Sequence, residues 1–125
     1  MISDEVRRFI LTSIPSVPYL EAALLFHADP GAGKTVQDVA RALYLRRSAA
    51  SQLMAEMCGT GLLHQSGDQG ELFHYAAKES ALGDMIARLA DEYRKNLIEV
   101  THLIHDETQR SATRFAAAFE LRKKE

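Results

Sequence analysis

The sequence predicts a mainly α-helical fold with one small β-hairpin, and three observations support this. Apolar residues recur at helical spacing over two short segments, residues 35–43 and 46–58. A glycine-containing stretch, residues 65–70, follows them and has the composition of a hairpin turn. A long amphipathic pattern then covers residues 82–104. We therefore expect a helix-turn-helix unit with a hairpin and an N-terminal helix over residues 1–79, and a C-terminal helical extension over residues 80–125.

The composition is that of an ordinary globular protein. Of 125 residues, 46% are hydrophobic and 26% charged, and the formal net charge is −2. No apolar run reaches membrane-spanning length and the N-terminus is unlike a signal peptide, so we expect a cytoplasmic protein with no membrane partner. The single Cys58 cannot form an internal disulfide, and we expect it to be a packed thiol.

The N-terminal segment predicts one short helix followed by another. Ser3 suits the cap of a helix that reaches Ile14, with Val6 and Ile10 on its buried side. Two prolines, at positions 15 and 18, then interrupt the chain, and Pro18 suits the first turn of the next helix.

The next helix begins at Thr35, which can cap its free amides. Asp38 lies three residues further on, where a carboxylate is favourable at the positive end of the helix dipole. The apolar stripe consists of Val36, Val39, Ala40 and Leu43.

Residues 28–35 offer a competing interpretation, because they fit a relaxed phosphate-loop pattern that ends in Gly33-Lys34-Thr35. The stricter pattern has glycine first, and this chain has Ala28. A phosphate loop must also follow a buried strand, whereas residues 19–27 have helical spacing. We expect a turn here, and no nucleotide cofactor.

The second helix of the pair spans about residues 46–58. Its apolar face consists of Ala50, Leu53, Met54 and Met57. A hairpin follows, with residues 62–65 as its first strand and residues 71–75 as its second.

The stretch from Thr35 to Met54, followed by Gly61-Leu62-Leu63, resembles the winged helix-turn-helix of MarR-type bacterial transcription regulators. In such families the second helix enters the major groove of double-stranded DNA by its N-terminal residues. Arginine pairs with guanine, glutamine pairs with adenine, and serine can bind base edges or phosphate. The resemblance implies that the DNA-binding residues are Arg46, Arg47, Ser48, Ala49, Ser51 and Gln52. We add the nearby Arg41 to this set.

The distribution of charge supports two different functions. Residues 41–55 include three arginines and no acidic residue, which favours DNA. The hairpin, residues 63–75, carries Asp68 and Glu71 but no lysine or arginine, whereas the wing of the resembling family usually has a basic tip. The alternative to a DNA-binding regulator is therefore a protein-protein adaptor that uses its wing and C-terminal helices.

The C-terminal pattern predicts one amphipathic helix of about six turns. Its apolar residues recur at steps of three and four, and we expect them to form a homodimer interface: Leu82, Ile86, Leu89, Tyr93, Leu97, Val100 and Ile104. The alternative is that the stripe folds back over the N-terminal helix of the same chain. A last helix with Phe115 and Phe119 on one face is expected to follow.

Neither a metal site nor a catalytic site is indicated. His102 and His105 resemble part of the metal-ligand pattern of ArsR-type regulators, but Tyr93 stands where that pattern has a histidine. We expect surface histidines and no bound metal. No serine or cysteine is paired with an identifiable base, so we expect no enzymatic activity.

Overall fold

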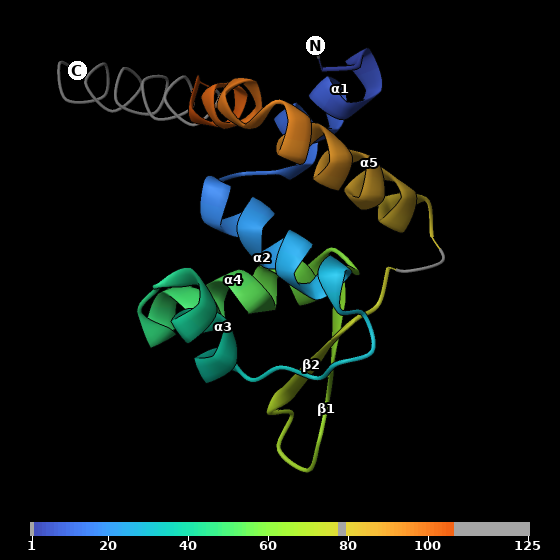
Figure 1. Cartoon of the computed structure of the whole chain (residues 1–125). Coiled ribbons are helices and arrows are strands. Elements are labelled where there is room, and N and C mark those ends of the chain that lie inside the picture. Colours follow the sequence, from blue (N-terminus) through green and yellow to red (C-terminus); the bar gives the residue numbers. More distant parts are fainter. Residues whose placement is uncertain (1, 78–79, 107–125) are drawn as a thin grey trace, which may run out of the picture. The chain divides into compact units, whose positions relative to one another are not determined.

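A computed structural model describes residues 2–77 and 80–106 of the chain. It is mainly helical and includes one two-stranded antiparallel sheet, as the sequence predicts. Figure 1 shows the elements, which are α1 Asp4–Ser13, α2 Val17–Ala28, α3 Val36–Leu43, α4 Arg47–Gly59, β1 Leu63–Ser66, β2 Leu72–Tyr75 and α5 Ala81–Lys95. Residues 97–106 are also helical, while the expected helix with Phe115 and Phe119 lies outside the described residues.

The chain forms two compact units by its internal contacts, while the expected boundary at residues 79 and 80 stays a prediction. Among the described residues, one unit combines the N-terminal residues up to Val17 with residues 92–106, and the other comprises Pro18–Asp91. The N-terminal helix therefore belongs with the C-terminal segment, because contacts between residues far apart in sequence decide the units. A local apolar pattern does not show which distant segment covers it.

The first unit begins with a capped helix. The Ser3 hydroxyl accepts a hydrogen bond from the Val6 backbone N–H at 3.3 Å, which ties down one free amide of α1. Its buried apolar residues come from both ends of the chain and are Val6, Ile10, Ile14, Val100 and Ile104. The alternative in which the C-terminal stripe folds back on its own chain therefore describes this part of the molecule.

The second unit is built around α3 and α4, which contact each other and form the predicted helix-turn-helix. The buried side of α4 consists of Ala50, Leu53, Met54 and Met57, as its spacing predicts. A hydrogen bond of 3.3 Å between the hydroxyls of Tyr19 and Thr60 joins α2 to the end of α4. The recognition-helix candidate is thus held along one face and at its C-terminal end.

The turn between α3 and α4 has an unusual backbone at Tyr44, which adopts the left-handed conformation at φ 56° and ψ 43°. The backbone N–H groups of Tyr44 and Leu45 both donate to the carbonyl oxygen of Ala40, the Leu45 bond at 2.9 Å, which closes the end of α3. Such a conformation costs a residue other than glycine about 1–2 kcal/mol.

At its other end, α3 has a complete capping box. The Thr35 hydroxyl accepts from the Asp38 backbone N–H at 3.1 Å, and the Asp38 carboxylate accepts from the Thr35 backbone N–H at 2.9 Å. The hydrogen bonds from Thr35, the backbone bond above all, hold the pKa of Asp38 below its ordinary value.

The capping box should make folding stability depend on pH. A carboxyl group whose pKa is lowered by folding stabilises the folded state above its unfolded pKa, and this contribution is lost as the pH falls through the folded pKa. Asp38→Asn should therefore lower the urea midpoint at neutral pH, and the difference from the parent should disappear in acid. Asp68→Asn, which removes a charge from the exposed end of the hairpin, is the control. Equal midpoint losses in the two variants at neutral pH would contradict this role of Asp38.

The hairpin, which we call the wing, pairs β1 with β2 so that Leu63 is opposite Tyr75 and Ser66 is opposite Leu72. One face is buried, and its residues are Leu63, Phe73 and Tyr75. The connecting loop is closed by the Glu71 carboxylate, which accepts from the Gln69 backbone N–H at 2.9 Å. Gly67 has φ +92°, and a Cβ there would collide with the Glu71 carboxylate, so this turn needs glycine.

The C-terminal stripe differs from the single long helix that was predicted. The regular helix is interrupted at Asn96, whose side-chain amide donates to the Glu92 carboxylate at 2.9 Å. Four of the seven expected interface residues are fully buried within the chain itself: Ile86, Leu89, Val100 and Ile104. Leu82 and Tyr93 are half-buried, whereas Leu97 is 52% exposed.

No single helix among residues 2–77 and 80–106 is both long and apolar enough to cross a membrane. Only the bent pair Asp4–Ser13 and Val17–Ala28, taken together, passes that test, and it does so by length and composition alone.

Candidate nucleic-acid interface

The N-terminal half of α4 presents a continuous polar surface. Its buried residues, Ala50, Leu53 and Met54, occupy one face, so the residues between them point outward. The exposed residues are Arg46, Arg47, Ser48, Ala49, Ser51 and Gln52, which are the six positions that the family resemblance selected on this helix. We call this set the α4 surface.

The start of α4 lacks the side-chain cap that α3 has. Arg46 occupies the cap position, and its side chain makes no capping hydrogen bond. No acidic residue lies in the first turn of α4. The positive end of the helix dipole and the first-turn amides therefore have no side-chain cap from this chain, which suits a phosphate group.

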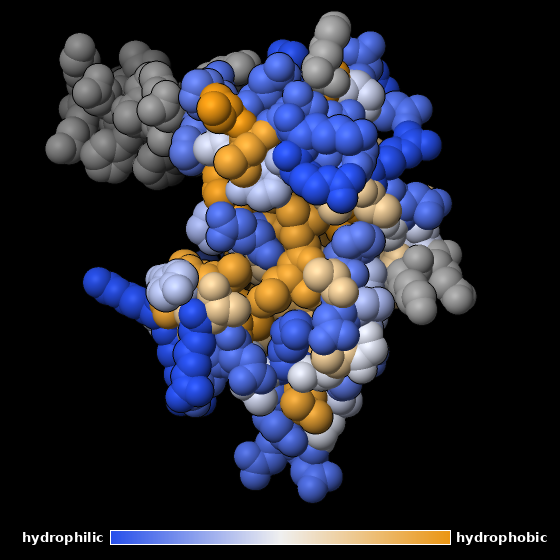
Figure 2. Space-filling view, viewed as in Figure 1, coloured by the Kyte–Doolittle hydropathy of each residue, from blue (hydrophilic) through white to orange (hydrophobic). Residues whose placement is uncertain are grey.

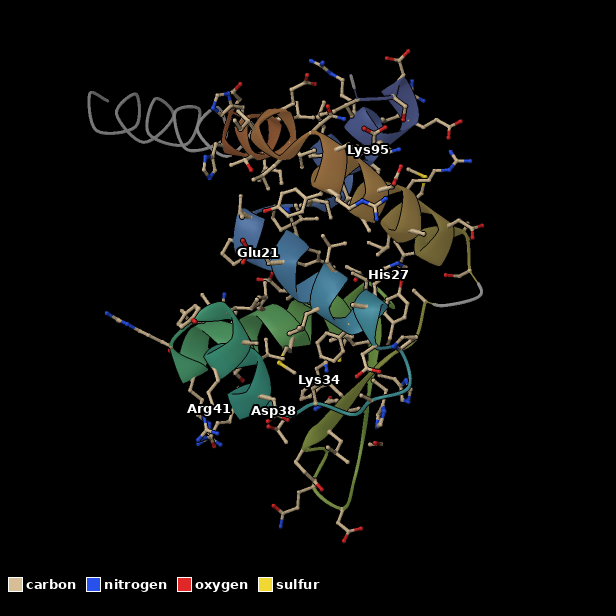
Figure 3. The ribbon with its side chains drawn as sticks, viewed as in Figure 1. Glu21, His27, Lys34, Asp38, Arg41 and Lys95 are labelled. Atoms are coloured by element: carbon tan, nitrogen blue, oxygen red, sulfur yellow. The ribbon has the colours of Figure 1, made fainter. Side chains whose placement is uncertain are left out.

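Arg41 extends the basic surface onto α3. It is exposed, and Figure 3 shows it projecting from α3 beside Asp38, on the side toward which the wing extends. The positive charge of Arg41 contributes, after the stronger hydrogen bonds from Thr35, to the lowered pKa of Asp38. One acidic group therefore lies at the edge of the basic surface.

The wing offers a different chemistry. Figure 2 shows hydrophilic residues at the tip of the wing, where Asp68 and Glu71 are exposed. On the face opposite the buried one, His64 and His74 lie directly across from each other with stacked rings, 5.1 Å between centroids and 19° between planes. The His74 Nε2 is 2.7 Å from the Ser66 hydroxyl. The sequence showed these histidines ten residues apart, and only the strand register brings them together.

Residues 28–35 do not form a phosphate loop in the structure. The segment follows α2, a helix, as expected, and its backbone at Lys34 pairs with Phe73 of β2 through two hydrogen bonds of 3.0 and 2.9 Å. Lys34 is half-buried beside the wing, whereas the sequence had placed it in an exposed turn. The Lys34 backbone amide is therefore occupied by the strand pairing and cannot bind phosphate.

Replacing Lys34 with alanine should accordingly have little effect. Its structural hydrogen bonds are made by backbone atoms, which the substitution keeps. We expect Lys34→Ala to match the parent in urea midpoint and in binding to duplex DNA, with no saturable binding of ATP and Mg²⁺ by either protein. Parent binding of Mg²⁺ and ATP that Lys34→Ala abolishes would restore the nucleotide-binding interpretation.

The remaining candidate ligands do not gather into a metal site within the part of the chain that the structure describes. His102 and His105 are both exposed, and no three histidine, cysteine or acidic side chains among the described residues lie together in a metal-binding arrangement. Cys58 is half-buried, and its burial raises the pKa of the thiol, which disfavours the reactive thiolate.

Comparison with solved structures identifies proteins of similar fold. MepR, a transcription regulator of the Staphylococcus aureus multidrug efflux pump MepA, matches with a TM-score of 0.54 at 15% identity, over 92% of this chain and 90% of MepR. RV1404 from Mycobacterium tuberculosis matches with a TM-score of 0.53 at 12% identity, over 97% and 84% of the two chains. A multiple antibiotic-resistance repressor (MarR) from Listeria monocytogenes matches with a TM-score of 0.50 at 15% identity, over 97% and 83%.

Neither the models of known families nor the sequences of curated proteins match this chain. At identities of 12–15% the structural similarity establishes the fold. Function has to be argued from the surface of the molecule itself.

Proposed function

We propose that this chain, which has the winged-helix fold of MarR-type transcription regulators, is a DNA-binding regulator of transcription in the bacterial cytoplasm. The observation that carries this proposal is the α4 surface, a solvent-exposed helix start with two arginines and no acidic residue in its first turn. Such a surface combines general attraction to phosphate with side chains that can distinguish bases.

The residues of the α4 surface divide by chemistry into two roles. Arg46, Arg47 and Gln52 have side chains long enough to form paired hydrogen bonds with guanine or adenine in the major groove. Ser48 and the adjacent free amides of the first turn suit a phosphate group, as does Arg41 on α3. The small Ala49 lets the helix approach the bases closely.

A homodimer would supply the second half of such an interface. Leu97 is 52% exposed and Ile98 is 69% exposed, so two large apolar side chains lie next to each other on the outside of the chain. We infer that a second copy covers them, because removing exposed apolar surface from water favours association and two-fold symmetric regulators read paired half-sites. We therefore propose residues 97–98 as the dimer contact.

The acidic wing favours a second function, that of a protein-protein adaptor without DNA binding. Asp68 and Glu71 repel phosphate, and hydrogen bonds from backbone amides hold the pKa of Glu71 below its ordinary value. Glu71 therefore stays charged at neutral pH, and the wing tip is negative. An adaptor would use this tip to contact a basic partner.

An anisotropy titration distinguishes the two functions. Labelled random duplex and labelled genomic fragments are titrated with the parent protein at low and physiological salt. A DNA-binding regulator binds both at low salt, loses affinity as salt rises, and keeps a preference for particular fragments. Absence of binding to any duplex at low salt would overturn the proposed function and leave the adaptor.

A further inference from the structure

Tyr44 has a strained backbone conformation and an exposed side chain. Among the described residues it is the only one other than glycine with a positive φ, at 56°. The residue is also 95% exposed. Residues held in a strained backbone conformation cluster at functional sites. The exposed Tyr44 side chain makes almost no packing contact that would offset the strain.

Neither local structure nor the core explains a tyrosine at this position. The conformation is imposed by the end of α3, where the N–H groups of Tyr44 and Leu45 share the Ala40 carbonyl. Glycine meets this requirement without a steric penalty and is the usual residue there. Tyrosine adds strain and exposes a large ring to water, so folding alone favours its replacement.

The surroundings of Tyr44 indicate what the side chain is for. It lies in the turn that joins Arg41 on α3 to Arg46 and Arg47 at the start of α4, and all three arginines are exposed. Residues 41–55 contain no acidic side chain. The turn thus lies, in sequence, between basic residues that attract phosphate.

We propose that the Tyr44 side chain is a contact for the sugar-phosphate backbone of duplex DNA. The phenol O–H donates a hydrogen bond to a phosphate oxygen, and the ring packs against the adjoining sugar. This inference rests on the proposed function, and adds to it a residue that sets the position of α4 in the groove. Phosphate contacts carry no base information, so Tyr44 contributes equally to specific and random DNA.

The test uses the full chain with Tyr44→Gly, Tyr44→Asn and Tyr44→Phe, measured by urea denaturation and by anisotropy with specific and random duplex. Glycine and asparagine both tolerate the left-handed conformation, so Tyr44→Gly should have a urea midpoint at or above that of the parent. Its affinity should nevertheless fall about five- to tenfold, by the same factor for both duplexes. Tyr44→Asn should behave like Tyr44→Gly. Tyr44→Phe, which keeps the ring, should lose about two- to threefold.

Opposite changes in stability and affinity separate a DNA contact from a structural role, since a structural residue would move both together. A Tyr44→Gly variant with parental affinity for both duplexes would overturn the inference while the proposed function stands. If Tyr44→Gly proves less stable than the parent, the affinity of Tyr44→Phe for duplex DNA decides whether Tyr44 binds phosphate. Tyr44→Phe removes only the hydroxyl and keeps the ring and the backbone preference. Parental affinity of Tyr44→Phe would then overturn the phosphate contact. A parent that binds no duplex at all overturns the proposed function, and this inference with it.

Discussion

Replacing Leu97 with glutamate should convert the protein from a dimer to a monomer and cost about a hundredfold in affinity for a two-half-site operator. Leu97 is 52% exposed, so the new carboxylate remains hydrated in the monomer and the chain should still fold. In a dimer the same carboxylate would have to lose its water without a partner, which is strongly unfavourable. Light scattering measures the mass, and anisotropy measures the affinity.

The choice of residue decides whether this experiment is informative. Leu89 belongs to the same apolar stripe but is fully buried in the chain, so Leu89→Glu would unfold the protein whether or not it dimerises. Glu99→Gln removes one negative charge at an exposed position two residues from Leu97, and it shows whether a change of local charge alone alters the mass. A parent that is monomeric at micromolar concentration would remove the dimer and the palindromic operator together.

Elements with strong local signals were predictable from the sequence. Thr35 caps α3 as expected, and Asp38 lies in its first turn, where it also completes a capping box. The wing closes around the glycine-containing turn. The exposed α4 surface follows from the same logic, because the positions of Ala50 and Leu53 on the buried face determine which residues remain outside.

Features that depend on distant parts of the chain were not predictable in this way. The pairing of Lys34 with Phe73 joins segments about forty residues apart, and the sequence of either segment alone does not predict this pairing. The burial of Val100 and Ile104 within one chain is a similar case. An apolar stripe shows that something covers it, but the same stripe is compatible with a partner subunit or with α1.

The left-handed backbone conformation of Tyr44 is a local feature, but the sequence did not predict it. Glycine or asparagine is the usual signal of a left-handed helix end, and a tyrosine at that position reads as an ordinary part of a connection. Only the backbone angle of Tyr44 shows that this residue departs from the common one.

Substituting Arg47 with alanine should weaken DNA binding about tenfold or more and change how the affinity depends on salt. Arg47 is the first residue of α4 and is exposed, so its removal leaves the buried face of the helix intact. If Arg47 binds phosphate, the slope of log affinity against log salt should become shallower by about 0.9, and random and specific duplex should lose equally. If it pairs with a base, the slope should change less and the preference for the specific duplex should shrink.

Arg8→Ala is the matched control, because it removes the same charge from an exposed position on α1, outside the helix-turn-helix. A general effect of net charge would lower the affinity of both variants alike, whereas a contact made by the α4 surface lowers only that of Arg47→Ala. Urea midpoints equal to the parental value would show that both variants fold. An Arg47→Ala variant that binds as well as the parent at every salt concentration would mean that α4 does not enter the groove by its N-terminus. The basic surface formed with Arg41 would then have to act through another orientation, or on a partner other than DNA.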